Sequence, residues 1–194
     1  RAVGEVMSIG KTYKEAFQKA IRSLETGRYG LGFAKNFHDK TKEQLIEMLH
    51  TPSSERQFIM YEALRKGATV EELYQLTKIK HYFLEQMKEL VDEEEALMQK
   101  KGEVPSKEAL ERAKKNGFSD KYLSQILAVP EDDIRNARKS YGITQAWEGV
   151  HVSGTEDREY FYSTYNAPDY SKTNEEKPKI MILGGGPNRI GQGI

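Results

Sequence analysis

The sequence of 194 residues contains no cysteine. This absence excludes disulfide bonds, thiolate metal sites and a cysteine nucleophile, and it suits a reducing compartment. Long apolar runs are lacking too: no stretch approaches the roughly 18 consecutive apolar residues that span a bilayer. Residues 1–30 do not have the layout of a signal peptide. We therefore expect a cytoplasmic protein with no membrane partner.

The sequence also lacks net charge, because its 30 basic and 30 acidic side chains cancel. Without a long basic block it has no signature of a nucleic-acid or anionic-membrane partner. Charged residues make up 31% and hydrophobic residues 37% of the chain. That balance is typical of solvated amphipathic helices rather than of a thick buried sheet.

The longest uninterrupted element that the sequence predicts is a helix over residues 79–101. Apolar residues recur there at steps of three and four, and neither glycine nor proline occurs before Gly102. We interpret this helix as the spine of a helical middle domain. We interpret the acidic run 92–95 as a solvated face or a contact with a basic partner. The predicted buried stripe consists of Ile79, Phe83, Met87, Leu90, Val91 and Leu97.

Start and stop signals predict shorter helices on both sides of this spine. Thr12 with Glu15, and Thr69 with Glu72, have the spacing of capping boxes. Short loops between short helices predict a mainly α fold, a compact multi-helix bundle. The predicted helices begin near Thr12, Thr41, Phe58, Thr69, Pro105, Ser119 and Pro130, and the last of them ends at Gly142.

The hydrophobic periodicity changes at Ile143. Residues 143–152 and 159–165 are rich in aromatic and β-branched side chains, which is typical of extended segments. Residues 166–178 have the composition of a linker. Residues 179–183 predict a short apolar strand that leads into a glycine-rich segment. Because the first strand of an open sheet needs a helix and partner strands to cover it, we expect the sequence to end just inside a truncated α/β domain.

The glycine-rich segment is the main candidate for a binding loop. Its spacing departs from the dinucleotide fingerprint, because Arg189 occupies the place of the third glycine, and it has no Walker lysine. Both a tight turn and contact with an anionic ligand are consistent with these glycines. The candidate residues are Gly184, Gly185, Gly186, Asn188, Arg189, Gly191 and Gly193.

Other sites have less support in the sequence. The four histidines, at positions 38, 50, 81 and 151, have no partner four residues away that could complete a zinc pair. We therefore predict no catalytic residue and no metal ligand. Residues 120–139 have the spacing of a helix-turn-helix. The side chains that would enter the major groove are Glu131, Asp132 and Asp133, which phosphate repels, so we expect no nucleic-acid partner.

Four segments carry a resemblance to a known family, in the same order and in register across the whole chain. They are VGEVMSIGKTYKEAFQKAIRSLE at residues 3–25, KHYFLEQMKELVDEEE at 80–95, YSTY at 162–165 and KIMILGGGPNRIGQGI at 179–194. Together they resemble the large subunit of carbamoyl phosphate synthetase. A match of four separate segments is far more specific than the glycine-rich loop alone.

The resemblance implies a division of the chain. Residues 1–11 would be the tail of a first ATP-grasp unit, and residues 12–142 a helical oligomerisation domain. Residues 143–178 would be an extended connector, and residues 179–194 would open the second synthetase half. In this family the first half makes carbamate from bicarbonate, ATP and ammonia from a glutaminase subunit. The second half phosphorylates carbamate with another ATP.

The resemblance also implies cofactors and partners. The parent enzyme uses ATP with Mg (or Mn) and K, whereas the nucleotide- and metal-binding side chains belong to ATP-grasp segments outside this sequence. We therefore expect no cofactor and no complete active site here. The implied partners are the remainder of the large subunit, the glutaminase small subunit and a second copy bound through the helical domain. The family serves arginine or pyrimidine biosynthesis, and the sequence does not choose between them.

For the loop Gly184–Gly193, the resemblance implies a place in the second half near the passage for carbamate. Arg189 would hold this loop in place or contact an anion. A hypothesis of a different class remains open beside the ligase. The chain could be an autonomous helical protein-interaction module without ligase activity, which shares only its ancestry with the family.

Overall fold

The computed structural model of the chain describes residues 6–33, 37–156, 159–171 and 176–181. Within these ranges the chain forms eight helices and a two-stranded antiparallel sheet, so the predicted mainly α fold is confirmed. The helices are α1 (Tyr13–Ser23), α2 (Lys42–Leu49), α3 (Arg56–Arg65), α4 (Val70–Thr77), α5 (His81–Met98), α6 (Lys107–Lys115), α7 (Asp120–Leu127) and α8 (Glu131–Ser140), and the strands are β1 (Ala146–His151) and β2 (Glu159–Thr164).

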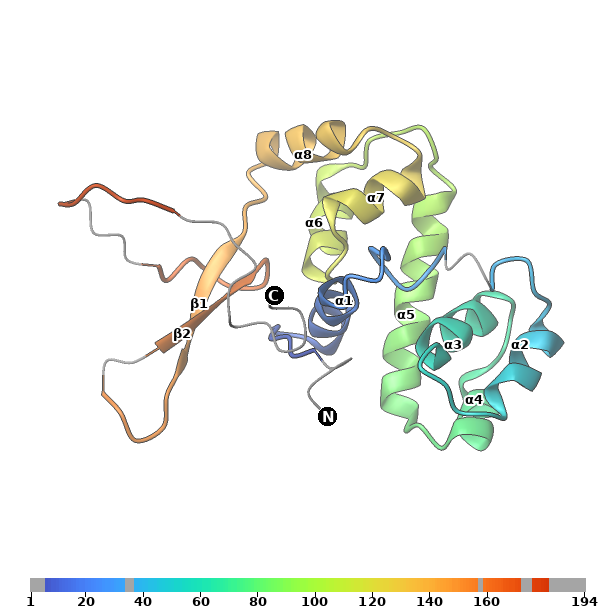
Figure 1. Ribbon diagram of the computed structural model, residues 1–194. Coiled ribbons are helices and arrows are strands. Elements are labelled where there is room, and N and C mark those ends of the chain that lie inside the picture. Colours follow the sequence, from blue (N-terminus) through green and yellow to red (C-terminus); the bar gives the residue numbers. More distant parts are fainter. Residues whose placement is uncertain (1–5, 34–36, 157–158, 172–175, 182–194) are drawn as a thin grey trace.

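Helix α5 is the longest helix and the centre of the arrangement. Figure 1 shows α2, α3 and α4 on one side of it, and α1, α6 and α7 on the other. Helices α1, α3, α4 and α7 all contact α5. The hairpin of β1 and β2 lies beyond α1, on the side of the molecule away from α2–α4 (Figure 1).

The predicted spine exists, but its boundaries and part of its buried stripe were wrong. Lys78 adopts a left-handed conformation with φ 59°, which ends α4 and separates it from α5. Phe83 is 41% exposed, whereas its neighbour Leu84 is fully buried. Leu84, three residues from Met87, takes the place predicted for Phe83, and Ile79 is half-buried and lies before the start of α5. The ring of Phe83 packs instead against Tyr13 of α1, with centroids 5.1 Å apart.

The helix starts follow the capping signals closely. Thr69 and Glu72 form the full capping box that the sequence predicts. At α1 only half of the predicted box forms. Thr12 accepts a hydrogen bond from Glu15 N, but the Glu15 carboxylate accepts from Lys11 N, one residue before the cap. The same carboxylate oxygen, Oε2, also accepts a hydrogen bond from Asn166, which lies after the second strand.

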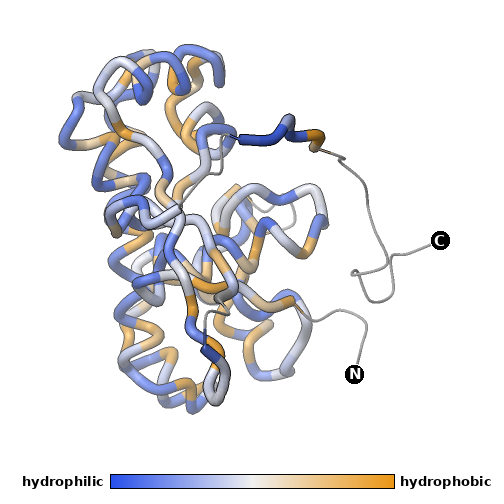
Figure 2. The backbone as a smooth tube through the Cα atoms, turned by 90° about the vertical axis from the view of Figure 1, so that its left-hand side faces the viewer, coloured by the Kyte–Doolittle hydropathy of each residue, from blue (hydrophilic) through white to orange (hydrophobic). Residues whose placement is uncertain are grey.

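The apolar core runs through all eight helices. Figure 2 shows hydrophobic and hydrophilic stretches alternating along the helical tube, as expected where each helix buries one stripe. At 25 cal/mol per Å² or so, burial of such side chains is the main favourable contribution to folding. The fully buried members include Leu45, Ala63, Leu73, Leu84, Leu110, Ala113, Leu123, Ile126, Leu127 and Ile134.

The extended segments predicted after Ile143 form a paired hairpin. Ala146 lies opposite Thr164, and Val150 opposite Tyr160. The strand predicted over residues 179–183 is absent from its described part, because residues 179–181 have no secondary structure. A strand needs a neighbour for its backbone hydrogen bonds, and among the described residues only β1 and β2 pair. Residues 182–194 lie outside the described part of the chain.

Candidate functional site

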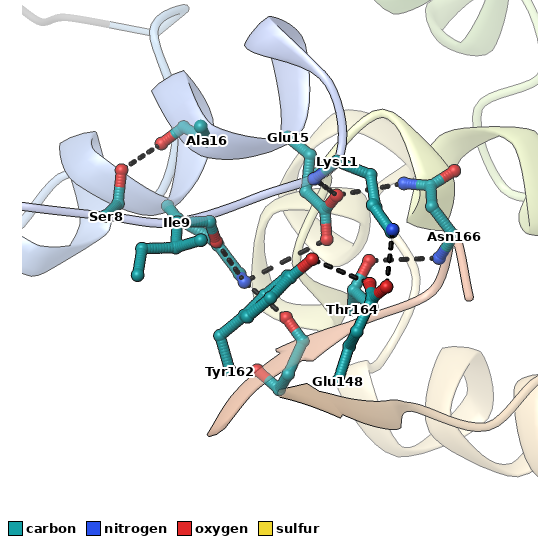
Figure 3. Close-up of polar contacts among 12 residues, drawn as sticks. Ser8, Ile9, Lys11, Glu15, Ala16, Glu148, Tyr162, Thr164 and Asn166 are labelled. Carbon is teal, nitrogen blue, oxygen red and sulfur yellow. Dashed lines mark hydrogen bonds and ion pairs between the residues drawn. The ribbon is translucent and has the colours of Figure 1, made fainter. Parts of the chain in front are cut away.

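The segment before α1 and the hairpin that follows α8 meet on helix α1 (Figure 3). We call this region the junction. It comprises residues 6–15, 146–156 and 159–166. Lys11 Nζ donates a hydrogen bond to Glu148 Oε1 at 2.5 Å. Lys19 Nζ donates to the carbonyl oxygen of Ile9 at 2.8 Å and also to that of Ser163. The incoming segment and the hairpin are thus attached to the same helix.

Glu15 is the central residue of the junction. Its side chain is 2% exposed. Its Oε2 accepts hydrogen bonds from Lys11 N at 2.8 Å and from Asn166 Nδ2 at 3.0 Å. Asn166 Nδ2 also donates to the carbonyl oxygen of Lys115, at the end of α6, at 2.8 Å. One buried carboxylate and one amide therefore connect three segments that are distant in the sequence, as Figure 3 shows in part.

A second set of contacts lies at the outer edge of the junction. Tyr162 OH donates a hydrogen bond to Glu148 Oε2 at 2.6 Å. The pKa of Glu148 is lowered, first by the hydrogen bond from Lys11 and then by the one from Tyr162. The same hydrogen bond, donated to Glu148, raises the pKa of Lys11. These groups are solvated, so they orient the hairpin more than they stabilise the fold.

Beneath the junction lies a layer of buried charge. Lys114 is 5% exposed and donates to Asp120 Oδ1 at 2.7 Å. Arg138 donates to the other oxygen of Asp120 at 3.1 Å. Burial lowers the pKa of Lys114 to about 8, although Asp120 opposes the shift. Arg22 of α1 donates to the carbonyl oxygen of Gly117 at 2.6 Å, and burial lowers its pKa.

Gly117 allows α1 to approach the turn between α6 and α7. Its φ is 93°, a conformation that side chains rarely adopt. A Cβ atom at this position would lie 3.0 Å from Glu15 Cα. The glycine therefore fixes how close α1, and the junction with it, lies to the rest of the bundle.

The helices enclose another charged cluster, around Glu94 of α5. Glu94 is fully buried, and Arg65 of α3 donates to its Oε1. Tyr61 OH and Tyr122 OH each donate to its Oε2 at 2.6 Å. Burial, followed by the charge of Glu94, raises the pKa of both tyrosines. The cluster connects α3, α5 and α7 in the interior.

Glu94 corrects the interpretation of residues 92–95 as a solvated face. Asp92 is 60% exposed as expected, but Glu94 lies within the buried stripe. The sequence contained a signal for this, because Glu94 is three residues from both Val91 and Leu97 and so shares their face. The basic partner exists, but it is Arg65 of the same chain.

The sequence-predicted site residues are not tested by the described structure. The whole loop Gly184–Gly193, including Asn188 and Arg189, lies outside the described residues. Three of the histidines each approach a carboxylate: His38 Nδ1 is 3.3 Å from Glu62 Oε1, and His81 Nε2 is 2.8 Å from Glu71 Oε2, while His50 is 4.0 Å from its partner. The described part of the chain contains no cluster of three or more side chains that could hold a metal ion.

The helix pair at residues 120–139 forms as α7 and α8, with Ala128 in a left-handed conformation between them. At the start of α8, Arg135 pairs with Glu131 and with Asp132. These acidic side chains are thus engaged within α8. Among the described residues, no helix combines the length and apolar character required to cross a bilayer.

Sequence reasoning did not identify the residues of the junction. Lys11, Glu15 and Asn166 form no motif, because Asn166 lies 151 positions after Glu15 and only the fold brings the three together. The aromatic residues of β2 gave a partial signal, since they predicted an extended segment there. Nothing in the sequence predicted which helix this segment would contact.

Comparison with known proteins gives the family. The model of the carbamoyl-phosphate synthetase large chain, oligomerisation domain, matches residues 5–142. The carbamoyl phosphate synthase large chain of Archaeoglobus fulgidus is 45% identical over the whole of this chain, which covers 19% of that protein. Its counterpart in Synechocystis is 42% identical, with 18% covered. The arginine-specific, chloroplastic large chain of Arabidopsis thaliana is 41% identical, with 17% covered.

The chain therefore spans about one fifth of the length of these curated relatives, while they match it from end to end. The family match covers the helical bundle and the segment that precedes it. Both findings agree with the resemblance carried by the four sequence segments. This chain belongs to the carbamoyl phosphate synthetase large-chain family.

Proposed function

We propose that this chain is the central part of the large subunit of a glutamine-hydrolysing carbamoyl phosphate synthetase. Such an enzyme is an ATP-dependent carbon–nitrogen ligase that makes carbamoyl phosphate from bicarbonate, ammonia from glutamine and two ATP. The central part connects the two ATP-grasp halves and mediates oligomerisation. The chemistry, with Mg (or Mn) and K, belongs to the rest of the large subunit, and the ammonia comes from the glutaminase small subunit.

The junction is the observation that supports the connecting role. Glu15 accepts hydrogen bonds from both the incoming segment, at Lys11, and the outgoing segment, at Asn166. Polar contacts therefore fix the directions in which the chain enters and leaves the bundle. Flanking domains attached through these segments would hold a defined orientation to the bundle and, through it, to each other.

The exposed surface of the hairpin and of the segment before α1 is consistent with this role. Trp147 is 44% exposed, Phe161 50% and Met7 86%. Large apolar side chains grouped in this way on a surface are typical of regions that contact another protein part. In the proposal, the flanking parts of the large subunit cover them.

A chimera tests the connecting role directly. The chain replaces the matching segment of the Archaeoglobus fulgidus large chain, to which it is 45% identical. We expect the chimera to release ADP when supplied with ATP, bicarbonate and ammonia. A matched chimera with a flexible linker in place of residues 12–142 should lose this activity. If the linker chimera is as active as the one carrying the chain, the connecting role is wrong.

The purified chain alone should release no ADP under the same conditions, and bicarbonate-dependent turnover by it would contradict the proposal. The alternative is an autonomous interaction module. Sequencing the source transcript distinguishes it from the proposed function. The proposal requires long ATP-grasp segments encoded on both sides of this sequence, and the alternative does not.

The oligomerisation role has its own measurement. Sedimentation velocity over a wide range of concentrations should show self-association of the purified chain through its helical part. A chain that remains monomeric at the highest concentration would show that these residues do not associate by themselves.

A further inference from the structure

A small cavity of about 70 Å³ lies where α1, the turn between α6 and α7, and the end of β2 meet. We call it the junction cavity. It is separate from the predicted glycine-rich loop, and it shares Glu15 and Lys19 with the contacts that hold the junction together. The side chains that matter for its chemistry are Glu15, Lys19, Arg22, Lys114, Thr164 and Tyr165.

The charges that line the junction cavity do not balance. Lys19, Arg22 and Lys114 are cationic, and Glu15 is the carboxylate among the lining residues. Behind Lys114, Asp120 pairs with both Lys114 and Arg138, so including that layer leaves the same positive excess. Positive charge held together away from bulk water is unfavourable unless an anion compensates it.

The carboxylates nearby already have partners of their own. Glu15 Oε2 already accepts two hydrogen bonds, and Glu15 Oε1 is 3.9 Å from Lys19 Nζ. Both oxygens of Asp120 are engaged, one with Lys114 and the other with Arg138. The pKa of Lys114 is lowered to about 8, chiefly by burial, and the charges of Arg138 and Arg22 contribute to the shift.

Two of the cations have unused N–H donors, whereas Lys19 already contacts two carbonyl oxygens and Glu15. An ammonium has three N–H donors and a guanidinium has five. Lys114 donates to Asp120, and Arg22 donates one of its N–H groups to the Gly117 carbonyl oxygen. Lys114 is 5% exposed, so its remaining donors face the protein interior and the cavity rather than bulk water.

We propose that the junction cavity binds a small oxyanion of the size of phosphate or sulfate. The cavity is several times larger than the roughly 10–15 Å³ that a single water requires. Arginine and lysine are the side chains that recognise such oxyanions, through charge-assisted hydrogen bonds. A bound anion would connect α1, α6 and the end of β2. Because it binds only the assembled junction, it would stabilise that region by mass action.

Calorimetric titration of the purified chain with inorganic phosphate tests the site, with ionic strength held constant by chloride. We expect saturable binding of one anion for each chain. Lys19→Gln should weaken it at least fivefold, and Lys19 lies at the edge of the cavity, 21% exposed, where its replacement leaves the core intact. Arg22→Gln should weaken it at least tenfold.

The matched control is Arg135→Gln on α8, because Arg135 pairs with Glu131 and Asp132 away from the cavity. It should leave the affinity within twofold. Absence of saturable phosphate binding, or an equal loss in Arg135→Gln and Lys19→Gln, would overturn the site. None of these results depends on ligase activity, so the site and the proposed function can fail separately.

A second arm uses sulfate, whose charge is constant between pH 7 and 9. Among the groups facing the cavity, burial lowers the pKa of Lys19 and raises that of Tyr165, while Lys114 has its pKa at about 8. The affinity for sulfate should therefore fall at least threefold as the pH rises through 8, as Lys114 loses its charge. An affinity that stays constant over this range would overturn the assignment of Lys114 to the site.

Discussion

The helical bundle and the junction are held together by different forces. In the bundle, side chains from every helix share one apolar core, and even its central charge, Glu94, is enclosed by partners. In the hairpin, Ala146 and Thr164 are buried, whereas Tyr160 is 74% exposed. The junction depends on polar contacts that converge on Glu15.

Because of this difference, we expect the bundle core to determine the global stability of the chain and the junction contacts to determine only the local order of the hairpin. Removing part of the bundle core should destabilise the whole chain, because the core is continuous and small domains unfold cooperatively. Removing a contact of the junction should release the hairpin while the bundle stays folded, because few apolar contacts hold the hairpin in place. Four substitutions test this separation, beginning with the largest expected effect.

Leu90→Ala should produce the largest effect. Leu90 is 1% exposed and lies on the buried stripe of α5. Truncation removes apolar contacts and leaves a cavity, which typically costs about 2–5 kcal/mol. A urea titration that follows helical signal measures the loss. A change well below 1 kcal/mol or so would mean that this face of α5 does not contribute as a core residue should.

Glu94→Gln should cost slightly less, about 2–4 kcal/mol. The substitution keeps the shape but leaves the mostly buried Arg65 with less compensation, and breaking a buried pair in this way is strongly destabilising. Glu95 and Glu62 remain near Arg65 and limit the loss. The control is Asp92→Asn on the same helix, where the 60% exposed carboxylate pairs with Lys88. Equal losses in the two variants would show that the enclosure of Glu94 has no energetic consequence.

Glu94 also illustrates what the sequence could and could not predict. The period of α5 identified Leu90, Val91 and Leu97 as buried, because helical spacing is a local property. The same spacing placed Glu94 on the buried face. The acidic composition of residues 92–95 nevertheless favoured the interpretation that Glu94 is solvated, because buried carboxylates are rare without a partner. The partner, Arg65, lies 29 positions away on α3, and no local sequence pattern predicts such a pair.

The fold was therefore more predictable than the junction. Capping residues such as Thr69 and terminators such as Gly142 affect only neighbours a few residues away. The helices that begin or end at such residues were therefore predicted correctly as helices. Leu84 also has the helical spacing of the stripe, whereas the contact of Phe83 with Tyr13 of α1 depends on the fold. The contact between Glu15 and Asn166 is entirely a consequence of the fold.

Lys114 gives a smaller effect, which depends on pH. Its pKa in the folded chain is about 8, below the ordinary lysine value, so between pH 8 and 10 the unfolded chain binds more protons. The contribution of Lys114 to the unfolding free energy should therefore become more favourable by about 1–3 kcal/mol as the pH rises through this range. The measurement is the difference in unfolding free energy between the parent chain and Lys114→Met, in buffers without phosphate or sulfate.

Lys115→Met is the matched control for that profile. Lys115 is the next residue of α6, is 45% exposed and pairs with Glu111. Its difference from the parent chain should not change between pH 8 and 10. If the difference in unfolding free energy between the parent chain and Lys114→Met does not depend on pH, burying the charged ammonium has no energetic cost. Lys114 in the cavity would then behave like Lys115 on the solvated surface.

Asn166→Ala should have the smallest effect on global stability and a clear effect on the junction. The side-chain amide donates to Glu15 and to the Lys115 carbonyl oxygen, and loss of two such bonds is worth about 1–2 kcal/mol locally. Backbone amides of β2 should then exchange with solvent about 5–30 times faster, as 1.4 kcal/mol corresponds to roughly tenfold. Amides of α5 should keep their protection.

Asn136→Ala, at an exposed position of α8, is the control and should change the exchange of neither set of amides. Faster exchange in α5 together with β2 would mean that bundle and junction unfold as one unit, and the distinction between a self-supporting core and an attached connector would not hold.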